Sequence, residues 1–215
     1  MNIRKLAKRI LGRNVKSTTK DYWEKSAKLS TKKTIDRICT GFNETKFSSL
    51  TKPNFFNDKN ILNSEMVVLD LACGMGRTCV WVASQVKRYV GVDFIPEMIE
   101  KAKKHNKEIV NAEFHINDGQ TLKIFDDKSF DVVYCELAFQ HMEKPVQRSY
   151  VPEIFRVLKD RGLFYVQIPK LSYYHDESFA LTKQEVNELF KNFKMTYLED
   201  GIAYYILKAK RPQEE

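Results

Sequence analysis

The stretch from residue 67 to residue 78 constrains the fold more than any other part of the chain. It reads Val-Val-Leu-Asp-Leu-Ala-Cys-Gly-Met-Gly-Arg-Thr, so an apolar run broken by one acid leads into two glycines and then into a segment suited to a helix. A buried strand, a glycine turn and a helix in this order are typical of the first unit of a parallel sheet. The carboxyl end of such a strand is where sheets of this kind bind ligands.

The rest of the chain continues the alternation of strands and helices. After the strand at 66–72, further strands are expected at 89–93, 113–116, 130–135 and 163–168, and helices at 76–87, 96–107 and 146–158. Thr182 and Glu185 have the spacing of a capping box, which predicts one more helix. Strands at 195–198 and 202–208 flank Asp200-Gly201, a strong hairpin signal. The predicted fold is α/β: a Rossmann-like, doubly wound, seven-stranded sheet, mostly parallel with an antiparallel C-terminal hairpin, plus N-terminal helices.

The segments before the sheet differ from it in charge. Residues 1–20 contain seven Lys and Arg residues and no acid, which leaves the other 195 residues with only +1 of the net charge of +8. Residues 3–11 place apolar and basic side chains on opposite faces of a short helix. We therefore expect three parts: a basic amphipathic helix and linker at 1–20, an N-terminal helical cap at 21–60, and the main domain at 61–211.

Several classes of protein are disfavoured by simple counts. No apolar run approaches the ~18–20 residues of a membrane span, and the N-terminus lacks the apolar core of a signal peptide. The four cysteines show no zinc spacing, and no carboxylate and histidine set predicts a metal. A cytoplasmic protein is expected, with peripheral contact to the inner face of the membrane through residues 1–13 as an open alternative. The oligomeric state is not predicted.

An acid at the end of the second strand points to the kind of ligand. Asp93 stands 23 residues after Asp70, at the position where a carboxylate accepts hydrogen bonds from ribose hydroxyls. Gly74 and Gly76 allow the backbone to approach a ligand closely. The glycine turn and the acid together predict a nucleoside-bearing cofactor.

Five segments in order resemble the class I S-adenosylmethionine-dependent methyltransferases, in particular their small-molecule and glycan-modifying branch. They are Asp70-Leu-Ala-Cys-Gly-Met-Gly-Arg, Gly91-Val-Asp-Phe-Ile-Pro-Glu-Met-Ile, Asn117-Asp118-Gly119, the stretch from Phe130 to Met142, and Arg156-Val-Leu-Lys-Asp-Arg-Gly-Leu. The resemblance covers about residues 60–210. It implies the cofactor S-adenosylmethionine and a reaction that transfers its methyl group by in-line displacement.

The resemblance also implies roles for individual residues. Asp70 would orient the glycine loop and help to hold the cofactor's ammonium group, and Asp93 would bind the ribose diol. The adenine would lie against Phe94 and Met98 and bind at the Asn117-Asp118-Gly119 turn. The methionine part would be lined by Ala72, Cys73, Gly74 and Cys135.

Catalytic candidates follow the fourth strand. Glu136 would lie near the sulfonium, and His141 could serve as a general base if the acceptor is a hydroxyl, because that proton must leave. Purely structural roles stay open as alternatives: Asp70 as a buried structural acid, Asp118 as an Asx-turn residue, and His141 as a residue that hydrogen-bonds its loop. Tyr22 and Trp23 are candidates for covering the cofactor, and residues 171–179 for an acceptor lid.

The favoured function is methyl transfer to a heteroatom, in particular a hydroxyl, of a small molecule or glycan. An NAD-dependent oxidoreductase shares the glycine turn and the ribose acid, but Cys79 stands where its third glycine would fall. Nucleic-acid methylation is disfavoured, because the chain reads Cys-Glu-Leu-Ala at 135–138 and lacks the Asn/Asp-Pro-Pro-aromatic motif of base-amine methylation. RNA ribose or ring methylation, and a binding subunit without turnover, remain as alternatives.

Overall fold

The structure is a computed structural model that describes residues 19–28, 61–174, 178–202 and 204–213. The chain divides into two units, residues 1–50 and 51–215. In the first unit, the helix α2 (Thr19–Ala27) buries Ser26 and Ala27. It starts before the predicted end of the linker at residue 20. The predicted basic helix at 3–11 and residues 29–60 of the predicted helical cap lie outside the described residues.

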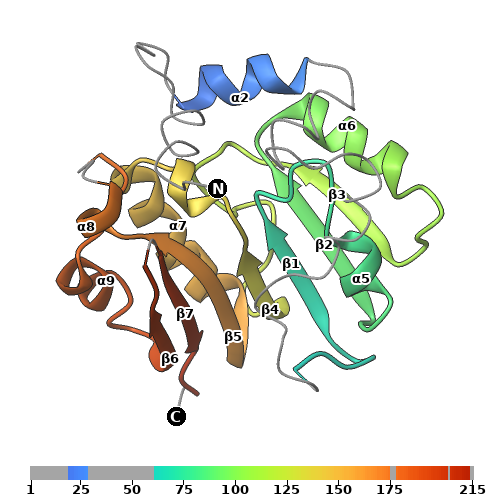
Figure 1. The fold of residues 1–215 in the computed structure, drawn as a ribbon. Coiled ribbons are helices and arrows are strands. Elements are labelled where there is room, and N and C mark those ends of the chain that lie inside the picture. Colours follow the sequence, from blue (N-terminus) through green and yellow to red (C-terminus); the bar gives the residue numbers. More distant parts are fainter. Residues whose placement is uncertain (1–18, 29–60, 175–177, 203, 214–215) are drawn as a thin grey trace. The chain divides into compact units, whose positions relative to one another are not determined.

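The second unit contains a seven-stranded sheet in the order β3-β2-β1-β4-β5-β7-β6 (Figure 1). Its strands are β1 (Val67–Leu71), β2 (Arg88–Asp93), β3 (Ala112–Ile116), β4 (Phe130–Cys135), β5 (Leu158–Pro169), β6 (Lys194–Asp200) and β7 (Tyr204–Lys210). The first five strands pair in parallel, and β7 runs antiparallel to both β5 and β6. The predicted fold class is confirmed, including the antiparallel hairpin at the C-terminus.

Helices cover both faces of the sheet. On one face, α7 (Lys144–Val157) and α9 (Lys183–Leu189) contribute to a core cluster with alternate residues of the central strands, such as Leu69 and Val133. On the other face, α5 (Cys79–Ala83) and α6 (Pro96–His105) pack with Val68, Tyr89 and Tyr134. Because side chains alternate along each strand, both faces of the sheet present apolar side chains to the helices that cover them.

The capping box is present: the Thr182 side chain accepts from the Glu185 backbone N–H, and the Glu185 carboxylate accepts from that of Thr182. The predicted helix at 76–87 is wrong at both ends. It is shorter because Gly76 has a φ of +71°, which a helix does not allow, and because the chain leaves the helix at Ser84. β5 begins five residues before the predicted strand, with a register shift opposite Phe130 and Val132.

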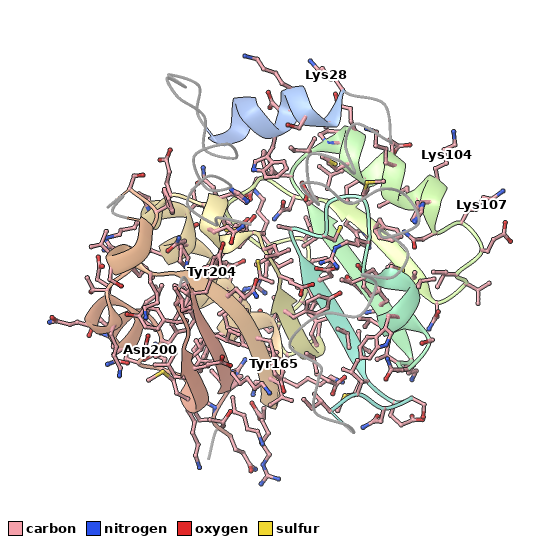
Figure 2. The ribbon with its side chains drawn as sticks, viewed as in Figure 1. Lys28, Lys104, Lys107, Tyr165, Asp200 and Tyr204 are labelled. Carbon is pink, nitrogen blue, oxygen red and sulfur yellow. The ribbon has the colours of Figure 1, made fainter. Side chains whose placement is uncertain are left out.

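The described surface carries mixed charges. Lys104 and Lys107 project outward near the end of α6 (Figure 2). Acids stand close by, and the pairs Lys103–Glu100 and Lys107–Glu108 lie at 3.9 and 3.5 Å. The surface around α6 therefore does not form a stripe of positive charge alone, which nucleic-acid binding would favour. Within the described ranges, no helix is both long and apolar enough to cross a bilayer.

Candidate cofactor and active site

The order in which the chain adds strands to the sheet reverses between β1 and β4, two neighbouring parallel strands in the middle of the sheet. From β1 the chain moves outward to β2 and β3, and it then returns to β4 and continues outward to β5. Neighbouring parallel strands in this arrangement leave a crevice at their carboxyl ends, where ligands bind. Asp70 pairs in register with Tyr134 of β4, so the glycine loop and the loop after β4 start at the same edge.

The two glycines of the loop have different reasons to be glycine. Gly74 has a φ of +55°, and a Cβ built there would meet no atom of the described residues within 4 Å. Gly76 has a φ of +71°, and its Cβ would come within 2.6 Å of Asn106 Nδ2 and 2.9 Å of the Phe114 ring. Gly76 therefore serves packing, whereas Gly74 leaves open space beside a backbone that ligands can approach. That open space is the feature that fits a bound cofactor.

Two other residues at the crevice have backbone conformations that favour glycine. Ala72 after β1 has a φ of +59°, and Leu137 after β4 has a φ of +58°. Such left-handed conformations cost a non-glycine residue about 1–2 kcal/mol. Leu137 also leaves 39% of its surface exposed, and its N–H donates to Gln167 Oε1 at 3.3 Å. Strain on both strands that flank the switch point is the pattern found at ligand sites.

The side chain of Cys73 does not face the open space. Its Sγ lies 2.9 Å from the position that a Cβ on Gly91 would take, so the thiol packs against β2. Its N–H donates to the carbonyl of Val92 at 3.0 Å. Burial raises the pKa of both Cys73 and Cys135 well above the usual range, so neither is a thiolate at neutral pH. Cys73 can line the cofactor through its backbone.

Asp93 holds the glycine loop in place from the end of β2. Its Oδ2 accepts from the Gly74 N–H at 2.9 Å, and its Oδ1 accepts from the Ile95 N–H at 3.0 Å. Burial raises the pKa of Asp93 to about 6, although backbone N–H donors oppose the shift. A carboxylate offers about four acceptor positions, so acceptor capacity remains for ribose hydroxyls. The role of Asp93 in binding the ribose stays a prediction. Its hydrogen bond to the Gly74 N–H was not part of that prediction.

Asp70 lies in a buried network of hydroxyl groups. Its Oδ2 accepts from Thr78 Oγ1 at 2.8 Å, from the Tyr89 hydroxyl at 2.6 Å and from the Tyr134 hydroxyl at 2.8 Å. Burial raises the pKa of Asp70 to about 6, while these three hydrogen bonds lower it in part. The bond to Thr78 ties β1 to the end of the glycine loop. The predicted contact with an ammonium group stays a prediction.

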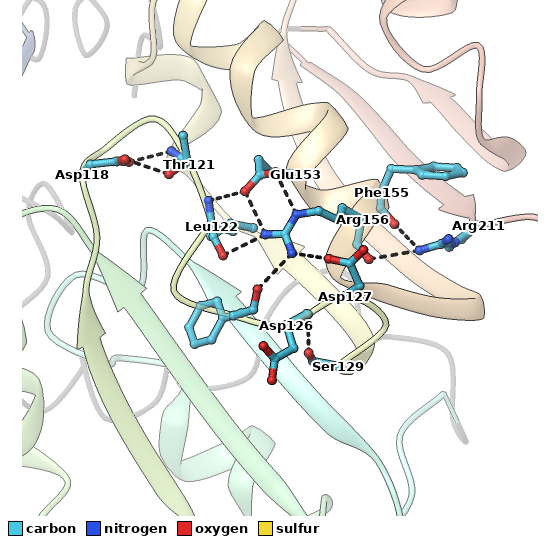
Figure 3. A network of polar contacts seen from close by, with 11 residues as sticks. Asp118, Thr121, Leu122, Asp126, Asp127, Ser129, Glu153, Phe155, Arg156 and Arg211 are labelled. Carbon is cyan, nitrogen blue, oxygen red and sulfur yellow. Dashed lines mark hydrogen bonds and ion pairs between the residues drawn. The ribbon is translucent and has the colours of Figure 1, made fainter.

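The turn after β3 is held together by its own side chains. Asp118 Oδ1 accepts from the Thr121 N–H at 2.6 Å, and Oδ2 accepts from Thr121 Oγ1 at 2.7 Å (Figure 3). Asp118 Oδ1 also accepts from the Gln120 N–H at 2.9 Å. These bonds lower the pKa of Asp118 to about 2. The side chain therefore has the contacts of an Asx turn, which is the structural role that the sequence left open for Asp118. Its predicted contact with the adenine amino group would have to use the remaining acceptor capacity.

Other residues of the predicted adenine site do come together. The Phe94 Cβ lies 3.2 Å from the position that a Cβ on Gly119 would take, so the aromatic side chain borders the turn. Met98 in the first turn of α6 is buried. Asn117 donates to the Thr121 carbonyl and the Tyr150 hydroxyl, both at 2.9 Å. The turn is thereby fixed to α7 as well as to itself.

A second anchor joins the loop between β3 and β4 to α7 (Figure 3). Arg156 donates to the carbonyls of Leu122 and Phe125 at 3.1 and 2.9 Å, and pairs with Asp127 at 2.6 Å. Glu153 binds Arg156 at 2.9 Å and accepts from the Leu122 N–H at 2.9 Å. These two side chains hold the segment that follows the Asp118 turn. No role for Arg156 follows from the sequence, because its partners depend on tertiary packing.

The end of β4 carries an ion pair that could not be predicted from the sequence. Arg77 Nη2 lies 2.6 Å from Glu136 Oε2, and the two side chains are 15% and 3% exposed. Arg77 follows the glycine loop, so the pair joins the loop to the end of β4. Glu136 therefore lies just after the carboxyl end of β4 with its carboxylate bound to a guanidinium, and its predicted place near the sulfonium stays a prediction. Arg77 is the last residue of the glycine motif that begins at Asp70, but its partner can be identified only from the fold.

His141 lies in η2 (Phe139–His141), the short 3₁₀ helix after β4. Burial lowers the pKa of His141 to about 4, so the imidazole is neutral at pH 7 and is a weak proton acceptor. Gln147 of α7 fixes this loop by donating to the carbonyls of Phe139 and Phe179 at 3.0 and 2.8 Å. The general-base role stays a prediction. In the predicted lid, α8 (Leu171–Tyr174) is described, whereas residues 175–177 are not.

Comparisons with known proteins agree with this fold. Residues 68–162 match a family described as a methyltransferase domain. The uncharacterized methyltransferase YcgJ of Bacillus subtilis is 35% identical over 103 residues, 47% of this chain and 40% of that protein. The crystal structure of the PH0226 protein from Pyrococcus horikoshii has a TM-score of 0.61 and 27% identity, covering 69% of this chain and 82% of that one.

A SAM-dependent methyltransferase from Aquifex aeolicus has the same fold, with a TM-score of 0.60 and 17% identity over 79% of this chain and 99% of that one. Residues 68–162 are thus similar to methyltransferase domains, and the sheet has the fold of these enzymes. The open side of Gly74 beside the Asp93-held loop fits a nucleoside-bearing cofactor such as S-adenosylmethionine. The chain spans less than half the length of the curated relatives it matches. Among the described residues, no cluster of three His, Cys, Asp or Glu side chains suits a metal ion.

Proposed function

We propose that the protein transfers the methyl group of S-adenosylmethionine to a heteroatom, in particular a hydroxyl, of a small molecule or glycan. The observation that carries the proposal is the open Gly74 beside the Asp93-held loop, in a domain that matches the methyltransferase family. When bound, the sulfonium cofactor supplies a methyl group already activated for displacement. The protein's part is to align the two reactants and to exclude water.

The residues after β4 would act on the acceptor. His141 is neutral at pH 7 and can take the proton of an attacking hydroxyl, although its low basicity limits the driving force. Glu136 would have to leave Arg77 before it could take a proton. Positioning is therefore expected to contribute more to the rate than proton removal.

The acceptor class is supported by what the β4 loop contains. Cys135, Glu136 and Leu137 stand where enzymes that methylate base amines carry a proline-rich motif, and Leu137 exposes an apolar side chain at this edge. An exposed apolar group suits the non-polar part of a small acceptor. The mixed charge around α6 gives no support to an extended nucleic-acid contact there.

Two experiments test the proposal in turn. Calorimetric titration with S-adenosylhomocysteine, NAD and NADP should show micromolar binding of S-adenosylhomocysteine alone, and a preference for NAD would favour the oxidoreductase alternative. Transfer of tritium from methyl-labelled cofactor into a cell extract, separated into small molecules, glycans and RNA, then identifies the acceptor. Label in the first two fractions supports the proposal. Label confined to RNA refutes the acceptor class, and no label in any fraction supports a binding subunit without turnover.

A further inference from the structure

Gln167 places an amide in the otherwise apolar and aromatic part of β5, residues 163–169. It lies two residues before the end of the strand and is only 8% exposed. The strand pairs with β4, and Cys135 at the end of β4 is in register with Val166. The amide therefore lies near the carboxyl edge of the sheet, where sheets of this kind bind ligands.

The orientation of this amide is fixed by the chain that follows β4. The Leu137 N–H donates to Gln167 Oε1 at 3.3 Å. A backbone N–H can only donate, so the amide oxygen must face Leu137 and the NH2 group must point elsewhere. Leu137 has a φ of +58°, and strained backbone of this kind clusters at ligand sites. The strained loop and the oriented amide thus belong to one feature.

The amide nitrogen of Gln167 is a donor that lacks a partner. Within the part of the chain that the structure describes, no hydrogen bond joins Gln167 Nε2 to another group. The enclosed, unpaired side-chain atoms include the amide oxygens of Gln140 and Gln147 but not this nitrogen, so a ligand can reach it. A nearly buried donor that stays unpaired is costly. A ligand atom that accepts a hydrogen bond would remove this cost.

The position of the amide points to the methyl acceptor. The features suited to a nucleoside lie at the ends of β1, β2 and β3, around Gly74, Asp93 and Gly119. In the order of the sheet, β4 separates β5 from all three. We propose that Gln167 Nε2 donates a hydrogen bond to an oxygen of the acceptor and so selects its class. A hydroxyl or carbonyl oxygen offers a lone pair, whereas an ammonium group offers none. This inference rests on the proposed function, because it assumes that an acceptor is methylated here.

Gln167 would position the acceptor without taking part in proton transfer. Holding the acceptor oxygen helps to align it with the methyl group, and alignment is the main task in such a displacement. An amide has no proton to lose or gain near neutral pH. Loss of the contact should therefore lower kcat/KM for the acceptor by the same factor at every pH, and the shape of the pH profile should not change.

Gln167→Glu tests the donor alone. Glutamate keeps an oxygen for the Leu137 N–H and replaces the NH2 group by a second acceptor. The acceptor sample is the extract fraction that takes tritium from methyl-labelled cofactor, with initial rates measured over serial dilutions at pH 8. The kcat/KM for this fraction should fall about 10- to 100-fold. Calorimetry should show S-adenosylhomocysteine affinity within about threefold of the wild type.

A second variant and a control complete the design. Gln167→Met removes both polar groups without adding a charge, so it should show the same split, and it replaces Gln167→Glu if that protein does not fold. The control is Gln85→Glu, which makes the same change near the amino end of β2, where Gln85 Nε2 donates to the Trp81 carbonyl at 2.9 Å. It should leave both readouts unchanged.

The outcomes separate the inference from the proposed function. Unchanged kcat/KM in the Gln167 variants would overturn the inference. Parallel losses of kcat/KM and of S-adenosylhomocysteine affinity would show a purely structural role and would overturn it as well. Wild-type protein that transfers no label to any fraction would refute the proposed function, and the inference would fall with it.

Discussion

Replacing Gly74 and Gly76 by alanine, one at a time, separates ligand binding from packing within a single loop. Both residues have positive φ, so both substitutions carry the same backbone cost of about 1–2 kcal/mol. The added Cβ differs: at position 74 it enters open space, and at position 76 it meets Asn106 Nδ2 at 2.6 Å and the Phe114 ring at 2.9 Å. Such overpacking costs a further ~1–3 kcal/mol.

The two variants should therefore fail in opposite ways. For a domain of this size, ~1 kcal/mol shifts Tm by about 2–4 °C. Gly74→Ala should lose a few degrees, and Gly76→Ala roughly 5–15 °C. S-adenosylhomocysteine affinity should fall at least about tenfold in Gly74→Ala, because the methyl group takes space that the ligand approaches. Folded Gly76→Ala should keep its affinity within about threefold.

Differential scanning calorimetry and isothermal titration on the same samples provide the two readouts. A Gly74→Ala protein that binds S-adenosylhomocysteine as tightly as the wild type would refute the placement of the cofactor at this glycine. A Gly76→Ala protein as stable as Gly74→Ala would show that Phe114 and Asn106 move aside at no cost, and the packing argument would fail.

Three further changes test other parts of the site. Ala72→Gly relieves a φ of +59° and should raise the free energy of unfolding by up to ~1 kcal/mol in urea titrations; a less stable variant would contradict the assigned strain. Arg156→Lys keeps the charge but cannot reach the Leu122 and Phe125 carbonyls together, so stability should fall by about 2 kcal/mol. The same change should weaken S-adenosylhomocysteine and 5′-methylthioadenosine by one common factor, and a selective loss of either ligand would argue against an anchor of the adenine turn. The pKa of Asp70 is raised to about 6 from an ordinary 3.8, so its favourable contribution is complete below pH 3.8 and is lost as pH rises through 6. Between pH 4 and 7, wild-type stability should fall relative to Asp70→Asn by on the order of 2–3 kcal/mol, and parallel pH profiles of the two proteins would exclude this shift.

The sequence predicted the fold well where local pattern and tertiary packing agree. The strand at 130–135 matches β4 at both ends because its alternate side chains fill both cores. The capping box at Thr182 is local chemistry and was likewise predictable. The helix after the glycine loop was predicted too long, since a positive φ at Gly76 and the turn at Ser84 are set by packing against neighbouring strands rather than by propensity.

The candidate site was predictable as a set of positions, but not as a set of contacts. Asp70 and Asp93 fall at the ends of their strands as expected, because a parallel sheet aligns those ends. The hydroxyls of Tyr89 and Tyr134 could not be assigned to Asp70, since that requires the register between three strands. The same holds for Arg77 and Glu136, which are 59 residues apart in sequence and meet at one edge.

Contacts within the protein limit the acceptor positions that the acidic side chains of the site can offer to a ligand. The sequence predicted Asp93, Asp118 and Glu136 as groups facing a ligand, yet each accepts hydrogen bonds or an ion pair from the protein. A ligand can therefore gain from them only by using spare acceptor positions or by exchanging a partner. Asp93 retains such a position, Glu136 must exchange Arg77, and Asp118 is engaged throughout its turn. We therefore expect Asp93 to contribute more to ligand binding than Asp118, whose contacts mainly shape the turn.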